Sequence, residues 1–87
     1  MLTAHSTRST RGHLHPSTAT RLRTARLARG LGLRQAAGIL GLNGGYLSRL
    51  ERGLRRPSVD VAMEIVRLYQ LDHDLAVDLI TQARPDR

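Results

Sequence analysis

The stretch GLGLRQAAGILGLNGGYLSRLERGLRRPS, residues 30–58, contains two short helical patterns on either side of a tight corner at residues 40–43. The first pattern places apolar side chains at positions i, i+3, i+4 and i+7, which form one face of a helix: Leu33, Ala36, Ala37 and Leu40. In the second pattern, Leu47 and Leu50 share the face opposite to Arg49. The stretch therefore predicts two short helices joined by a corner.

The corner contains the residues that such a junction requires. Gly41 can adopt the left-handed backbone conformation that ends a helix sharply. Asn43 offers a side-chain oxygen that can cap the next helix. Two helices held at a steep angle in this way form a helix-turn-helix, whose second helix can enter the major groove of DNA.

The same region resembles the Cro/phage-repressor-like (xenobiotic-response-element) helix-turn-helix family of DNA-binding proteins. The likeness covers about residues 20–83, and its most specific part is YLSRLERG at residues 46–53 followed by RRPS at residues 55–58. Further matching pieces are Leu22-Arg23, Arg26, Arg29-Gly30-Leu31 and Leu40-Gly41-Leu42. The chain departs from the family at four positions that are usually polar there: Gly32, Leu33, Gly44 and Gly45. The resemblance implies an all-α, five-helix, lambda-repressor-like DNA-binding domain.

Composition limits the classes of protein that the chain can belong to. Its 87 residues suffice for one small domain, and without Cys it has neither disulfides nor thiolate metal sites, which suits a reducing cytoplasm. No apolar run approaches the roughly 18 residues of a membrane span, and the N-terminal residues lack the apolar core of a signal peptide, so we expect neither feature. The formal net charge is +7, and residues 20–57 carry nine Arg against Glu51 alone. A polyanion would dock on that half, so we expect a cytoplasmic protein associated with the nucleoid.

We expect three regions along the chain. Residues 1–19 are polar and predict a disordered, basic N-terminal arm, and residues 84–87 predict a short C-terminal tail. Between them, residues 20–83 predict five helices, with starts near Thr20, Leu33 and Gly44 and after the capping residues Ser58 and Asp72.

Helical geometry sorts the residues that would contact DNA. The second helix of the motif should present a base-reading set consisting of Asn43, Gly44, Gly45, Ser48 and Arg49. Arg49 is the strongest candidate, because a guanidinium matches O6 and N7 of guanine. A second set should contact phosphates: Arg23, Arg52, Arg55 and Arg56. The two glycines either let the backbone approach DNA closely or are merely tolerated.

Other residues are expected to support the structure. The family resemblance implies that Arg26 and Glu51 form a structural ion pair, and Tyr46 is expected to pack. One apolar set on the last helix predicts a homodimer interface, unless that helix simply closes the core of a monomer: Leu75, Leu79 and Ile80. The scattered acids and histidines give no catalytic or metal-binding spacing, so we expect no enzyme, metal or cofactor.

The sequence thus predicts a duplex-DNA-binding transcriptional regulator, a repressor, which inserts residues 44–52 into the major groove as a homodimer and has no membrane partner. The alternative keeps the fold as a protein-interaction module, for example an antitoxin-like or regulatory partner, with weak or no specific DNA binding.

Overall fold

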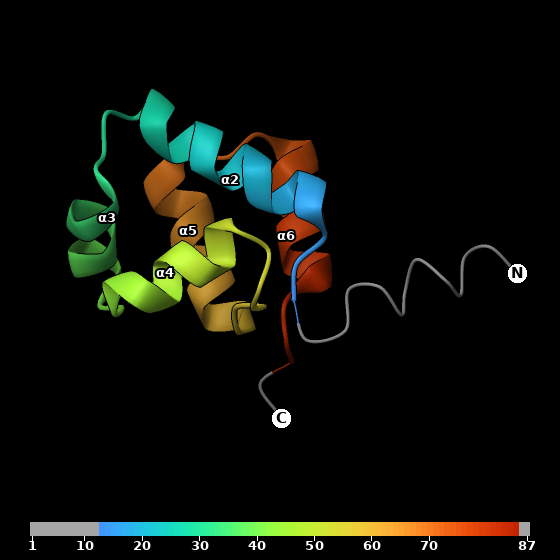
Figure 1. Ribbon diagram of the computed structural model, residues 1–87. Helices are drawn as coiled ribbons and strands as arrows, with labels where there is room; N and C mark the ends of the chain where they lie inside the picture. The colour runs from blue at the N-terminus through green and yellow to red at the C-terminus, as the bar shows by residue number, and fades with distance from the viewer. Residues whose placement is uncertain (1–12, 86–87) are drawn as a thin grey trace, which may run out of the picture.

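The computed structural model describes residues 13–85 and is all-α over that range, as predicted. Its elements, in chain order, are α2 (Pro16–Ala28), α3 (Leu33–Leu40), α4 (Gly44–Glu51), α5 (Val59–Tyr69) and α6 (His73–Gln82). Figure 1 shows α3 and α6 on opposite sides of α5, and α2 packs against α4, α5 and α6. None of the helices in the described range has both the length and the apolar character that a bilayer crossing requires.

The helix ends follow the predicted capping chemistry. The side chain of Asn43 accepts hydrogen bonds from the N–H groups of Gly45 and Tyr46, so it begins α4. Ser58 and Asp72 cap α5 and α6 in the same way. Gly41 has a φ of 71° and ends α3 in the left-handed conformation, which turns the chain directly into α4.

The core lies where the five helices meet. Its largest fully buried side chains come from every helix except α3, which contributes only small ones: Leu22 from α2, Leu47 and Leu50 from α4, Ile65 and Tyr69 from α5, and Leu79 from α6. Ala36 and Ala37 are the buried residues of α3, and their small size lets α3 approach α4 and α5 closely.

The first described helix begins earlier than predicted. It begins at Pro16 instead of near Thr20, and Leu14 is fully buried, so residues 13–19 belong to the packed domain and not to an arm. Proline suits the first turn of a helix because the N–H that it lacks would have no partner there. The remainder of the expected arm, residues 1–12, lies outside the described residues.

The start of α2 and the end of α6 are joined by one side chain. Oε1 of Gln82 accepts a hydrogen bond of 2.8 Å from the N–H of His15. Nε2 of the same amide donates to Oγ1 of Thr18 at 2.9 Å. This contact joins the residues around His15 to the end of α6.

The expected C-terminal tail is also partly packed. The N–H of Arg84 donates to the carbonyl of Pro57 at 2.7 Å, and the N–H of Val59 donates to the carbonyl of Arg84 at 3.1 Å. Ala83 and Pro57 are buried beside this bridge. Residue 84 therefore belongs to the domain, whereas residues 86–87 lie outside the described range.

Candidate nucleic-acid interface

One face of α4 is exposed, and it is the face predicted to meet DNA. Leu47 and Leu50 are fully buried on the inner side of the helix. Arg49 and Arg52 are exposed on the outer side of the helix, and Ser48 is half-buried. The structure therefore leaves two cations available along the outer surface of α4.

The N-terminal turn of α4 carries two glycines that differ in their surroundings. A Cβ atom at Gly44 would meet nothing within 4 Å. A Cβ atom at Gly45 would lie 3.0 Å from Oδ1 of Asn43 and 3.6 Å from Nη1 of Arg49. Gly45 thus leaves room both for the cap and for the Arg49 guanidinium, which lies against the first turn of its own helix.

A groove runs between the outer faces of α3 and α4, and it brings four of the five predicted base-reading residues together. Its lining consists of Leu33, Arg34, Ala37, Gly38, Leu42, Asn43, Gly44, Gly45 and Ser48. Arg34 is exposed as well, and it was not predicted to contact DNA although it lies one turn before Gly38 on the polar side of α3. Arg34 therefore adds a positive charge to the α3 side of this groove.

A second groove flanks α4 on the side of α2. Arg23 and Arg52 are both exposed along it, and the lining includes Arg26 and Glu51. These four side chains come from α2 and from the C-terminal end of α4, where Arg52 follows Glu51 as the cap. The packing of α2 on α4 therefore holds Arg23 close to the predicted recognition helix.

Arg26 and Glu51, predicted as a structural pair, form a buried ion pair beneath this groove. Nε of Arg26 donates to Oε2 of Glu51 at 2.9 Å, and Nη2 donates to Oε1 at 2.9 Å. Only 5% of Arg26 and 6% of Glu51 is exposed, so the carboxylate presents no free negative charge to the surface. The hydrogen bonds to Glu51 raise the pKa of Arg26, although burial acts against that shift.

Two further contacts complete the pair. Nη1 of Arg26 donates to the carbonyl of Leu31 at 2.8 Å, and the hydroxyl of Tyr69 donates to Oε2 of Glu51 at 2.8 Å. Burial, then the hydrogen bond to Glu51, raises the pKa of Tyr69 well above its usual value. Every polar atom of the carboxylate therefore has a partner, as a buried charge requires.

The loop after α4 contains the remaining two predicted phosphate contacts. Arg55 is exposed, and its guanidinium carbon lies 5.8 Å from the ring centroid of Tyr46, a cation–π geometry. Arg56 is half-buried, and its Nε is buried without a hydrogen-bond partner among residues 13–85. Its carbonyl accepts hydrogen bonds from the Tyr46 hydroxyl at 3.4 Å and from Nε of Arg84 at 3.1 Å. The hydroxyl of Tyr46 is therefore hydrogen-bonded to the loop.

The acidic residues lie on other elements. Along α5 and α6 the chain places Asp60, Glu64, Asp72, Asp74 and Asp78. Among residues 13–85 no three His, Cys, Asp or Glu side chains are grouped so as to hold a metal ion. The grooves beside α4 therefore carry Arg without competing carboxylates, except for the paired Glu51.

The expected dimer surface on α6 needs correction. Leu75 is 5% exposed and Leu79 is fully buried, because both fill the monomer's own core against α2 and α5. Ile80 is 39% exposed and Val77 is 47% exposed, so these two residues form the apolar surface of α6. The spacing of the apolar residues had identified the helix but not the side that it buries.

One comparison with known proteins returns a match. A family model described as a helix-turn-helix domain matches residues 19–79, the greater part of the chain, from α2 to α6. No curated protein and no solved structure matches the chain significantly.

Proposed function

The chain belongs to the helix-turn-helix domain family, and on that basis we propose that it is a transcriptional regulator that binds duplex DNA. The observation that carries the proposal is the coincidence of motif and charge. The outer face of α4 and the two grooves beside it carry exposed Arg23, Arg34, Arg49 and Arg52, and the one carboxylate there is neutralised by Arg26. Such a surface suits a polyanion.

In the proposed complex, α4 lies in the major groove with its N-terminal turn toward the base edges. Arg49 reads guanine, because its guanidinium already lies beside the first turn of the helix at Gly45. Ser48 and the amide of Asn43 add shorter contacts, although Oδ1 of Asn43 remains engaged in the cap. Gly44 lets the backbone approach the DNA, since no neighbour occupies the space beside it.

The phosphates on either side of that groove are contacted by the flanking cations. Arg23 and Arg52 bear on one strand from the groove between α2 and α4. Arg34 bears on the other strand, and Arg55 and Arg56 extend the contact along the loop. Because few side chains face the bases directly, most of the affinity comes from these phosphate contacts.

We further propose that the regulator acts as a repressor, binds as a homodimer and works on nucleoid DNA in the cytoplasm. One recognition helix spans only a few base pairs, and two-fold symmetry doubles the contact on a palindromic site. Val77 and Ile80 are the exposed apolar residues of α6 available for that interface.

The salt dependence of binding tests this proposal. About five engaged Arg should give a slope of about −4 to −5 in a plot of log affinity against log salt, measured by mobility shift on a selected site. Arg67→Ala on α5 is the matched control, since Arg67 faces Glu64 and lies away from both grooves. A wild-type slope shallower than about −2 would contradict the docking of α4 against phosphates.

A second candidate is a protein-interaction module of the same fold, such as an antitoxin-like partner. It is favoured by the absence of side chains at Gly44 and Gly45, where a base-reading helix would use them. The same assay separates the two candidates, because this module would bind duplex DNA weakly or not at all and would show no preference for a selected site over random duplex.

A further inference from the structure

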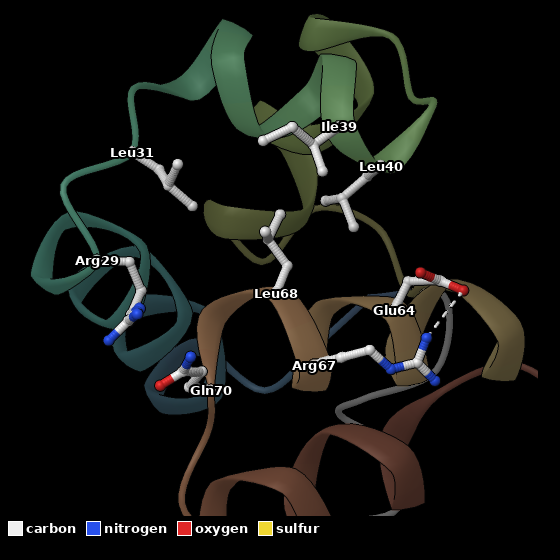
Figure 2. Close-up of a pocket in the computed structure, with 8 residues that line it drawn as sticks. All are labelled: Arg29, Leu31, Ile39, Leu40, Glu64, Arg67, Leu68 and Gln70. Carbon is white, nitrogen blue, oxygen red and sulfur yellow. Dashed lines mark ion pairs between the residues drawn. The ribbon is translucent and has the colours of Figure 1, made fainter.

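A hollow of about 430 Å³ lies on a different side of α3 from the proposed DNA surface. Its walls come from the turn after α2, the end of α3 and one face of α5 (Figure 2). In the part of the chain that the structure describes, no residue lines both this hollow and either of the grooves beside α4. We call it the α3–α5 groove, and a protein docked on DNA through α4 leaves it free.

The centre of the α3–α5 groove is apolar. Figure 2 shows Leu31, Ile39, Leu40 and Leu68 pointing toward one another from three separate segments of the chain. Ile39 is 59% exposed, the largest exposed fraction among the large apolar side chains of residues 13–85. The other three are half-buried, so the core supports them without covering them. A concave apolar surface of this kind is stabilised when a partner removes it from water.

Positive charge stands at the ends of the groove. Arg29 lies at one end beside Gln70, and Arg67 lies toward the other end (Figure 2). Arg67 is partly neutralised by Glu64, whose Oε2 lies 3.7 Å from its Nη1. Within residues 13–85, Arg29 forms no ion pair and is exposed. The end formed by Arg29 therefore offers an uncompensated cation next to an apolar centre.

Gln70 is the residue that ends α5, and it lies at the same end of the groove as Arg29. Its φ is 54°, and it is the only residue other than glycine with a positive φ in the described part of the chain. The other left-handed positions are occupied by Gly30, Gly41 and Gly53. The left-handed conformation ends α5, and it costs a residue other than glycine some free energy. Here the strained residue places an amide with both donors and an acceptor at the groove.

We infer that the α3–α5 groove binds an acidic segment of a partner protein. One aliphatic or aromatic side chain of the segment sits among the four apolar residues, and a neighbouring carboxylate pairs with Arg29. Charge complementarity with Arg29 favours an anionic occupant. The apolar centre favours a peptide over DNA, because a phosphate backbone has no apolar group to fill it. The inference does not rest on the proposed function, since the two surfaces share no residue.

The test begins with a display library of random short peptides, selected on the full chain and counter-selected on Ile39→Asp. Ile39 is mostly exposed, so this substitution should leave the fold intact. We expect the selected peptides to pair Leu, Ile or Phe with Asp or Glu. By fluorescence anisotropy, Arg29→Glu should weaken their binding about tenfold or more, because it opposes like charges. Exchanging the peptide's acid for Lys should restore binding to Arg29→Glu but not to the wild type.

Two matched variants separate binding from folding and from DNA recognition. Gln70→Gly removes the cost of holding a side chain at positive φ, so it should raise thermal stability. It also removes the amide from the groove, so it should weaken the binding of the selected peptides. Arg52→Glu at the C-terminal end of α4 should weaken the binding of duplex DNA and leave the affinity for the peptides unchanged. The two binding activities can therefore be lost separately.

Three results would overturn the inference. The first is a selection that enriches no peptide, or only peptides that bind Ile39→Asp equally well. The second is a selected set without acidic residues. The third is concentration-dependent self-association of the wild type that Ile39→Asp abolishes, since this would assign the α3–α5 groove to a second copy of the chain.

Discussion

The hydroxyl of Tyr69 on α5 donates a hydrogen bond of 2.8 Å to Oε2 of Glu51, the last residue of α4. The same oxygen accepts from Nε of Arg26 on α2 at 2.9 Å. One carboxylate thus ties α4 to two other helices at a point opposite its exposed face. The orientation of α4 therefore depends on a buried charge and not only on the packing of Leu47 and Leu50.

We predict that Glu51→Leu lowers the free energy of unfolding by about 3–5 kcal/mol, because it leaves the Arg26 charge buried without its partner. Urea denaturation measures the loss. The control replaces all three members, Arg26→Met with Glu51→Leu and Tyr69→Phe, and should recover most of the stability because no charge is then stranded. A single variant within about 1 kcal/mol of the wild type would show that Arg26 finds another partner.

We predict that stability falls at alkaline pH. The pKa of Tyr69 is raised in the folded chain, so the unfolded chain loses this proton first. The contribution is fully present below the unfolded pKa of about 10 and is lost above it, at up to about 1.4 kcal/mol per pH unit. Denaturant titrations across this pH range measure the slope. Tyr69→Phe removes the group, so the decline should become shallower, and an unchanged slope would point to another titrating residue.

We predict that Gly44→Ala raises stability by up to about 1 kcal/mol, because helical Gly is entropically costly and the added Cβ meets nothing within 4 Å. Gly45→Ala should gain less, since its Cβ lies 3.0 Å from Oδ1 of the capping Asn43. If Gly44 serves close approach to DNA, Gly44→Ala should still bind duplex more weakly. Thermal melts and mobility shifts on the same samples measure both effects, and unchanged affinity would remove Gly44 from the contact.

We predict that Arg49→Ala removes the preference between DNA sequences. The lost discrimination against the wrong base should be about 1–3 kcal/mol at one base pair. Arg55→Ala should instead weaken binding evenly to all sequences, because Arg55 is exposed on the loop beside α4. Selection of bound sites from a random duplex pool compares the two variants. If the Arg49→Ala pool returns the wild-type motif, the bases are recognised by other residues.

We predict that Ile80→Asp abolishes a dimer on DNA while the monomer stays folded, because Ile80 is 39% exposed. Leu79→Asp should unfold the chain instead, since Leu79 is fully buried. Sedimentation with a palindromic duplex measures the stoichiometry, and circular dichroism checks the fold. Two folded Ile80→Asp chains per duplex would exclude this side of α6 from the interface.

The local features of the fold were predictable because they depend on neighbours in sequence. The spacing of Leu33, Ala36 and Ala37 indicated α3, and the turn chemistry of Gly41 and Asn43 placed the corner before α4. Asp72 marked the start of α6 for the same reason.

The features that were missed depend on contacts between distant parts of the chain. Leu14 is a lone apolar residue among polar ones, and it is fully buried at a place where its carbonyl lies beside Gly53, a residue far away in the sequence. The hydrogen bond from Tyr69 to Glu51 was also missed, because it joins residues 18 positions apart. Likewise, periodicity placed Leu75 and Leu79 on one side of α6 without indicating whether that side meets the core or a partner.

The Gln82 amide, which bonds both His15 and Thr18, means that the two ends of the domain are neighbours in space. The helices could therefore be joined in a different order along the chain and still pack in the same way. Proteins with adjacent ends tolerate circular permutation, provided that the new ends open in an exposed connection. A chain that joins residue 85 to residue 13 through a flexible linker, and opens between α5 and α6, keeps α3 and α4 contiguous. This permuted chain would present the same outer face of α4 although its helices follow one another in a different order.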